Sequence, residues 1–192
     1  TNALKYNFTN EGGVDGTIRF LKNITGLWLI QEVKRAWEMK HGKITWDDIM
    51  KEAENAAPFK FFLNPDDSSF LNPPNMIHAV QDYCKKTSQE IPGTMGEIAR
   101  MIFESLAFRY KQVLEFLENI TGNKIKIFHV IGGGSKNALL CQFTSNAMNL
   151  PVLAGPSEAT TIGNILVQGL ATGTVETLQH LRAIVRNSFP LQ

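Results

Sequence analysis

Three consecutive glycines, Gly132, Gly133 and Gly134, stand between an apolar, β-branched run and a stretch with helical spacing. The amino terminus of a helix offers unpaired N–H groups and a partial positive charge, which suit phosphate and other anions. Glycine before it lets a ligand approach the main chain closely, at a cost in backbone entropy. The pattern indicates a nucleotide-contacting turn, although turns between a strand and a helix also use glycine for purely structural reasons.

Two known phosphate-binding fingerprints do not fit this stretch. A P-loop needs Lys followed by Ser or Thr after its last glycine, whereas here Ser135 precedes Lys136. The dinucleotide fingerprint needs a small residue where Asn137 stands and an acid at the end of the next strand. The next apolar run ends instead in Ala-Gly-Pro-Ser, and Glu158 lies at a predicted helix start. A dinucleotide-dependent oxidoreductase therefore fits the sequence poorly.

Several carboxylates could in principle act as a general base, and each also has a structural explanation. They are Glu11, Asp15, Asp66, Asp67 and Glu158. Each lies in a predicted turn, loop or helix cap, where acidic residues are common for structural reasons. We nominate none of them as catalytic and none as a metal ligand.

Composition excludes several other classes of protein. In 192 residues, 43% are hydrophobic and 19% charged, with a formal net charge of +1, so we expect a soluble domain without a nucleic-acid footprint. No apolar run approaches the roughly 20 residues of a membrane helix, and no signal peptide opens the chain, so we expect a cytoplasmic protein. Cys84 and Cys141 form no metal-type spacing, and we expect two buried thiols rather than a disulfide. The oligomeric state stays open.

The periodicity of apolar residues predicts an α/β fold. We expect short strands or a hairpin within 4–21, strands at 125–131 and 152–154, and helices at 27–39, 45–58, 75–86, 95–120, 137–148, from 157, and 175–187. The second half reads β-α-β-α, which favours neighbouring parallel strands. Thr45 and Asp48 have the spacing of a capping box.

The segment 59–76 is rich in Pro, Asn, Asp and Ser, yet we expect an ordered loop because it also carries large apolar side chains. The side chains that we expect to be buried there are Phe59, Phe61, Phe62, Leu63, Phe70 and Leu71.

Three separated stretches together resemble one known family. The stretch at 131–164, IGGGSKNALLCQFTSNAMNLPVLAGPSEATTIGN, resembles the carboxy-terminal signature of the FGGY carbohydrate kinases. Two further stretches, NFTNEGGVDGTIRFLKNITGLWLIQEVKR at 7–35 and FFLNPDDSSFLNPPNM at 61–76, look like the rhamnulokinase branch of that family, with fuculokinase as its near neighbour.

The resemblance implies an actin-like, ribonuclease-H-like ATPase lobe with a mixed sheet flanked by helices. Residues 1–192 would form the carboxy-terminal nucleotide-binding lobe of a sugar kinase, without the sugar-binding first domain. The first strands of the lobe, the catalytic aspartate and a phosphate-binding hairpin would precede Thr1, so we assign no catalytic residue and expect this fragment to be inactive alone.

The activity implied for the full-length enzyme is the transfer of the γ-phosphoryl group of ATP, with Mg²⁺, to a ketose. For this branch the reaction converts L-rhamnulose to L-rhamnulose 1-phosphate. Two alternatives stay open: a kinase for L-fuculose or xylulose, and a non-catalytic actin-like module that binds nucleotide.

The resemblance also assigns site residues. Gly133 matches the central glycine of an adenine-nucleotide turn that Gly132 and Gly134 shape, so a side chain there would occupy space that the nucleotide needs. Asn137 could cap the following helix or contact the adenosine, and we favour the cap.

Two further polar residues take a role from the resemblance alone. Asn23 matches a sugar-contacting position and Gln31 a nucleotide-contacting one, whereas their local sequence would indicate a turn or cap Asn and a solvated Gln. A spacing of eight residues predicts that both lie near one helix face.

Overall fold

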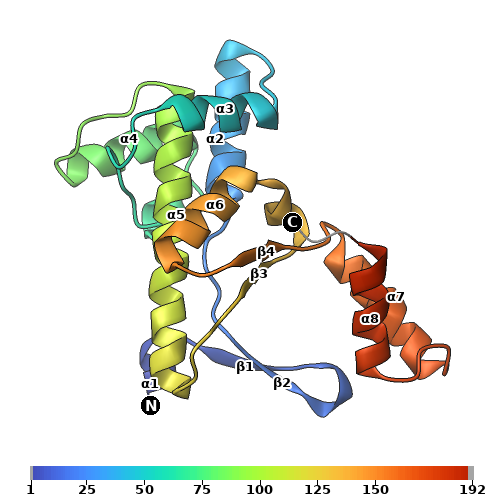
Figure 1. Ribbon diagram of the computed structural model, residues 1–192. Helices are drawn as coiled ribbons and strands as arrows, with labels where there is room; N and C mark the ends of the chain where they lie inside the picture. Colours follow the sequence, from blue (N-terminus) through green and yellow to red (C-terminus); the bar gives the residue numbers. More distant parts are fainter. Residues whose placement is uncertain (1, 190–192) are drawn as a thin grey trace.

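The computed structural model describes residues 2–189 and has a mixed α/β fold, shown in Figure 1. Its amino-terminal half contains α1 (Asn2–Lys5), β1 (Thr9–Gly12), η1 (Val14–Gly16), β2 (Ile18–Leu21), α2 (Trp28–His41), α3 (Trp46–Asn55), η2 (Ser68–Phe70) and α4 (Met76–Lys86). The remainder contains α5 (Met95–Thr121), β3 (Phe128–Val130), η3 (Gly132–Lys136), α6 (Ala138–Met148), β4 (Val152–Ala154), α7 (Ala159–Ala171) and α8 (Leu178–Ser188).

The strands form two small sheets. β1 and β2 are antiparallel, from the pair Thr9 and Leu21 to the pair Gly12 and Ile18, which confirms the predicted hairpin. β3 and β4 are parallel, with Phe128 opposite Val152 and Val130 opposite Ala154, which confirms the predicted β-α-β arrangement through α6. The first of these parallel strands covers less of the chain than the predicted range 125–131.

The core surrounds the long helix α5, which packs against α3 and α6 and stands upright to the left of the centre in Figure 1. Nineteen buried residues make up its main cluster, with contributions from α2, α3, α4, α5 and α6. Gly96 on α5 allows the close approach of α3, because a Cβ atom there would lie 2.5 Å from the carbonyl oxygen of Glu52. The position therefore excludes a larger residue on packing grounds.

The helix ends follow local sequence signals. Thr45 and Asp48 form the predicted capping box of α3, in which the Asp48 N–H donates to the Thr45 hydroxyl over 3.1 Å. Thr94 and Glu97 form a second box at the start of α5. Gly42 ends α2 with φ of 86°, a left-handed conformation that glycine adopts without steric cost. These caps fix where α2 stops and α3 begins.

The loop between α3 and α4 is ordered, as predicted, but only part of its apolar content is buried. Phe61, Leu63 and Phe70 are buried. The prediction was wrong for Phe59, Phe62 and Leu71, which are 62%, 37% and 72% exposed.

Burial alternates along 61–64, so that Phe61 and Leu63 are buried and Phe62 between them is exposed. Phe59 and Leu71 lie outside this stretch, at exposed positions of the loop. Two hydrogen bonds connect the backbone of this loop to α5 side chains. The Phe59 N–H donates to Glu104 Oε2 (2.9 Å), and the Leu63 N–H donates to Ser105 Oγ (3.0 Å).

Other departures from the predicted elements lie near the two ends. Helix α1 falls within a segment where we expected strands, α7 begins at Ala159, and α8 begins at Leu178 after its cap Thr177. Helices α7 and α8 form a hairpin set to one side of both sheets, and neither contains a buried residue.

The two cysteines are free thiols, as predicted. Cys84 is buried, whereas Cys141 is only partly buried, which corrects the expectation of two buried thiols. None of the helices within residues 2–189 combines the length and the apolar character needed to cross a membrane.

Candidate functional site

The three glycines open a short 3₁₀ turn, η3, rather than leading directly into α6. Gly132 has φ of 75°, and its N–H donates to the carbonyl oxygen of Pro156 over 3.1 Å. The Ser135 hydroxyl donates back to the Gly132 carbonyl oxygen over 2.8 Å, and the Asn137 N–H donates to that of Gly134 over 3.1 Å. The turn is thus held by its own hydrogen bonds and by the end of the β4 segment.

The three glycines differ in the surroundings that a Cβ atom would meet at each position. Gly132 has a left-handed backbone, where a side chain would be strained. A Cβ atom on Gly134 would make ordinary contacts, 3.7 Å from Val130 Cγ1 and 3.8 Å from Leu27 Cδ1. A Cβ atom on Gly133 would meet nothing within 4 Å. Gly133 is therefore the member of the turn that exposes bare main chain to open space.

That open space is a cavity of about 440 Å³ between α2, α3 and η3. Its lining consists of Leu27, Ile30, Gln31, Trp46, Asp47, Met50, Gly133, Lys136 and Asn137. The cavity joins an apolar wall to a few polar groups, as small-molecule sites commonly do, and its volume lies in their usual range. Three of the residues predicted to contact nucleotide, Gln31, Gly133 and Asn137, line it together.

Asn137 is the N-cap of α6, because its Oδ1 accepts a hydrogen bond from the Leu140 N–H over 2.9 Å. The preferred interpretation of this residue as a cap agrees with that contact. Since the side chain also lines the cavity, its remaining amide NH₂ group could still donate to a ligand. Capping and ligand binding are therefore compatible at this residue.

Asn23 does not line this cavity, and the prediction that it shares a helix face with Gln31 was wrong. Residues 22–26 have no helical structure, and α2 begins only at Trp28. Hydrogen bonds hold this segment away from the helix: Lys22 Nζ donates to the Tyr6 carbonyl oxygen (2.8 Å), and the Thr25 N–H donates to Asp66 Oδ1 (2.9 Å).

Sequence reasoning missed the wall that α3 contributes, made by Trp46, Asp47 and Met50. These residues lie far from the glycines in the chain, and their spacing is that of any short amphipathic helix. The one relevant local signal was the Thr45 capping box, which fixes where the first turn of α3 begins. Only the packing of α3 against α5 shows which residues of that turn border the cavity.

The thiol of Cys141 lies beside the glycine turn, with Sγ 3.9 Å from the Gly134 carbonyl oxygen. Burial raises the pKa of this thiol above its ordinary value, because the surroundings disfavour the thiolate. A protonated thiol is a poor nucleophile, so this shift does not favour a nucleophilic role for Cys141.

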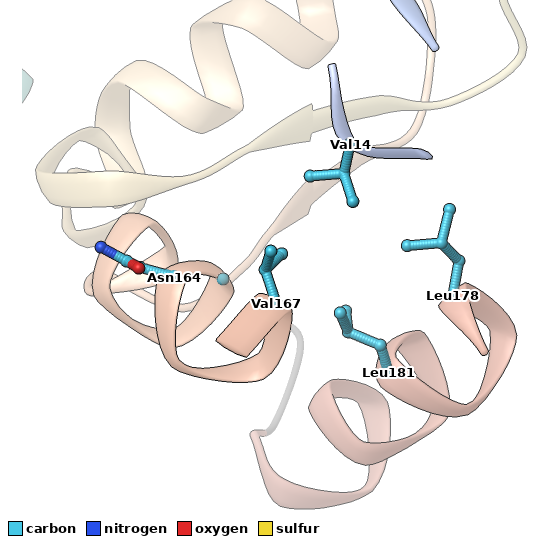
Figure 2. A pocket seen from close by; sticks show the side chains of 6 residues that line it. Val14, Asn164, Val167, Leu178 and Leu181 are labelled. Atoms are coloured by element: carbon cyan, nitrogen blue, oxygen red, sulfur yellow. The ribbon is translucent and has the colours of Figure 1, made fainter. Parts of the chain in front are cut away.

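A second cavity, of about 460 Å³, lies between the β1–β2 turn and the α7–α8 hairpin. Figure 2 shows Val14 reaching toward the hairpin residues Val167, Leu178 and Leu181. Its lining contains no titratable group and only one polar side chain, that of Asn164. It therefore offers packing surface but no groups for acid–base chemistry.

Three of the five carboxylates considered from the sequence have structural partners. Glu11 pairs with Arg19 over 2.7 Å, Asp66 with Arg109 over 2.6 Å, and Asp67 accepts from the Ser69 N–H over 2.9 Å. Glu158 is the N-cap residue of α7 but makes no side-chain cap hydrogen bond. Within residues 2–189, no three or more His, Cys, Asp or Glu side chains gather as a metal site would require.

Comparison with known proteins identifies the class to which this fold and cavity belong. Residues 1–172 match the FGGY family of carbohydrate kinases, C-terminal domain. The chain therefore belongs to the FGGY family of carbohydrate kinases, which confirms the resemblance noted in its motifs.

Among its relatives, three proteins named rhamnulokinase align with nearly the whole chain. The protein from Bacteroides thetaiotaomicron is 48% identical over 192 residues, which is 100% of this chain and 38% of the relative. The protein from Bacillus subtilis is 45% identical over 99% of this chain and 39% of the relative. The protein from Enterococcus faecalis is 44% identical over 99% of this chain and 38% of the relative. The chain thus spans 38–39% of the length of these curated relatives.

Proposed function

We propose that this chain is the nucleotide-binding, carboxy-terminal lobe of a kinase that phosphorylates L-rhamnulose to L-rhamnulose 1-phosphate with ATP. The observation that carries the proposal is the cavity shared by Gln31 and Gly133, two positions that the resemblance assigns to nucleotide, and by Asn137, which could cap the helix or contact the adenosine. The relatives named rhamnulokinase, 42–48% identical to this chain, support the choice of sugar. An actin-like arrangement of the whole lobe is part of the same proposal.

The cavity suits a nucleotide because it combines bare backbone, apolar surface and a few polar groups. At Gly133 the main chain can approach the ligand without an intervening side chain. Gln31 offers both a donor and an acceptor, and the Asn137 amide offers donors beside the amino terminus of α6. Lys136 brings a positive charge to the same cavity, which favours an anionic ligand.

Phosphoryl transfer depends mainly on positioning the reactants and on neutralising charge. The contribution of this chain would be to bind and orient the nucleotide. The Mg²⁺ that the family implies would neutralise charge on the phosphates, and the described residues form no group of three or more His, Cys, Asp or Glu side chains that could hold it. We therefore assign it no ligand among the described residues, and we propose that the catalytic base lies elsewhere in the full-length kinase.

Asn23 is our proposed contact to the sugar. Its side chain is exposed on the segment that leads into the cavity residue Leu27. An amide can donate to one hydroxyl of a polyol and accept from another, so it suits a sugar better than a purely donating side chain.

The nucleotide part of the proposal is tested by enlarging Gly133 in the full-length kinase. The main chain at Gly133 has no disfavoured φ and open space beside it, so Gly133→Val should fold normally while filling the cavity. We expect its dissociation constant for ATP, measured by calorimetry, to rise by about tenfold or more. Gly12→Val, at another open glycine outside the cavity, should bind ATP as the parent does. Equal ATP affinity in all three proteins would overturn the assignment of the site.

The sugar is tested separately by offering the full-length kinase L-rhamnulose, L-fuculose and xylulose. We expect the highest kcat/KM for L-rhamnulose. A preference for L-fuculose or xylulose would change the proposed acceptor sugar but leave the proposed kinase activity in place. Binding of ATP without transfer to any of them would favour a non-catalytic nucleotide-binding module.

A further inference from the structure

Trp46 is a large aromatic side chain that remains 44% exposed at the edge of the candidate nucleotide cavity. The same helix buries Ile49 and Ala53 completely, so its apolar face is already used elsewhere. The same cavity is lined by Ile30 of α2 and by Leu27, the N-cap residue of that helix. An indole facing an aliphatic wall can enclose a flat ring, because aromatic side chains stack well on nucleobases.

The capping box of α3 holds the backbone beside Trp46. Trp46 is the first residue of α3, directly after the capping residue Thr45, whose hydroxyl and N–H both bond to Asp48. The ammonium group of Lys34 lies 5.6 Å from the centre of the Trp46 ring, within the range of a cation–π contact. A side chain held in this way loses little conformational freedom on binding, which favours affinity.

Asp47 places a carboxylate in the same cavity, next to Trp46 in the chain. Its neighbour Asp48 is occupied in the capping box, whereas no ion pair within 4.0 Å engages Asp47 among the described residues. A carboxylate repels phosphate, so Asp47 must face an uncharged part of a nucleotide. Two vicinal hydroxyls of a ribose are the natural partners, because a carboxylate has acceptor sites for both.

We propose that the first turn of α3 is the nucleoside-recognition wall of the kinase, where Trp46 stacks on the base and Asp47 accepts hydrogen bonds from the ribose hydroxyls. The proposal rests on the proposed function, since it needs a nucleotide in this cavity. On this proposal the phosphates would be bound by the glycine turn and Lys136, which line the same cavity. It also gives the exposure of Trp46 a physical reason.

The stacking half is tested in the full-length kinase with Trp46→Ala and the matched control Trp28→Ala. Trp28 is 43% exposed on α2 but does not line the cavity. Loss of one base-stacking aromatic should weaken ATP binding by about tenfold, while the control should bind as the parent does. Indole fluorescence gives an independent readout: ADP should change the emission of the parent and of Trp28→Phe, but not that of Trp46→Phe. Equal behaviour of the two sites would overturn the stacking role.

The ribose half is tested with Asp47→Asn and the matched control Glu52→Gln on the same helix, using ATP and 2′-deoxyATP. A charged acceptor of a ribose hydroxyl should make the parent prefer ATP by about tenfold. Asp47→Asn should lose most of that preference, and Glu52→Gln should retain it. If Asp47→Asn weakens both nucleotides equally, Asp47 does not contact the 2′-hydroxyl. If Gly133→Val weakens ATP binding while Trp46→Ala and Asp47→Asn leave it unchanged, α3 does not recognise the nucleoside. The proposed function then still stands.

Discussion

Arg109 on α5 and Asp66 in the loop between α3 and α4 form an ion pair with an Nη2–Oδ2 distance of 2.6 Å. The other carboxylate oxygen of Asp66 accepts the backbone N–H of Thr25 over 2.9 Å. Asp66 therefore connects α5 to the segment that carries Asn23. The loop motif Asn-Pro-Asp-Asp thus acts as a support for the segment of the proposed sugar contact.

Replacing Asp66 should therefore affect the sugar more than the nucleotide. In the full-length kinase, we expect Asp66→Asn to raise the KM for L-rhamnulose by about fivefold, because a misplaced contact weakens substrate positioning, with little change in the KM for ATP. Asp67→Asn is the matched control, since Asp67 bonds only locally to Ser69. Steady-state kinetics with each substrate varied in turn would decide. A parallel rise in both constants would indicate a general structural defect instead.

Asn137 allows capping to be separated from nucleotide binding. Asn137→Ala should lower the free energy of unfolding by about 1 kcal/mol, because the Leu140 N–H loses its acceptor. Asn137→Ser should keep the cap, as serine is nearly as good at this position. Thermal denaturation and ATP calorimetry on both variants would separate the roles. If Asn137→Ser keeps full ATP affinity, the amide does not contact the nucleotide.

Gly96 should tolerate no side chain, because a methyl group there would press on the backbone of Glu52. We expect Gly96→Ala to destabilise the protein by about 1–3 kcal/mol through overpacking of α5 against α3. Gly163→Ala, inside α7 with open space beside it, should instead be neutral or stabilising by up to about 1 kcal/mol. Melting temperatures of the two variants provide the comparison. A melting temperature of Gly96→Ala at or above that of the parent would contradict the packing argument.

Glu97 should contribute to a loss of stability in acid. The backbone N–H groups of Gly93 and Thr94, which bond to its carboxylate over 2.9 and 3.2 Å, hold the pKa of Glu97 below its ordinary 4.5. Since the folded state favours the ionised form, the stabilisation is present above pH 4.5 and is lost as the pH falls through the lowered pKa.

The corresponding experiment is a melting-temperature profile against pH for Glu97→Gln. We expect this variant to be less stable than the parent at neutral pH and to lose less stability on acidification. Glu54→Gln, at an exposed position outside the capping box, should follow the parent profile. Identical profiles for parent and Glu97→Gln would mean that the cap adds no pH-dependent stability.

The sequence by itself determined most of the elements and the family. Thr45, Asp48, Gly42 and Asn137 act on neighbours a few residues away, so short-range rules predict the caps and helix ends they form. The parallel pairing of β3 with β4 also followed from the order of the elements, because a strand, helix and strand in succession favour it. The motifs identified the family because they stand in three separate stretches between residues 7 and 164, and the family match extends over residues 1–172.

Only the tertiary structure decided which distant residues share a site. Gln31, Trp46 and Gly133 border one cavity because α2 and α3 pack around the core beside the glycine turn. Asn23 is excluded from it because hydrogen bonds to distant partners keep its segment out of the helix. Such contacts depend on the packing of whole elements, and neither periodicity nor local propensity contains that information.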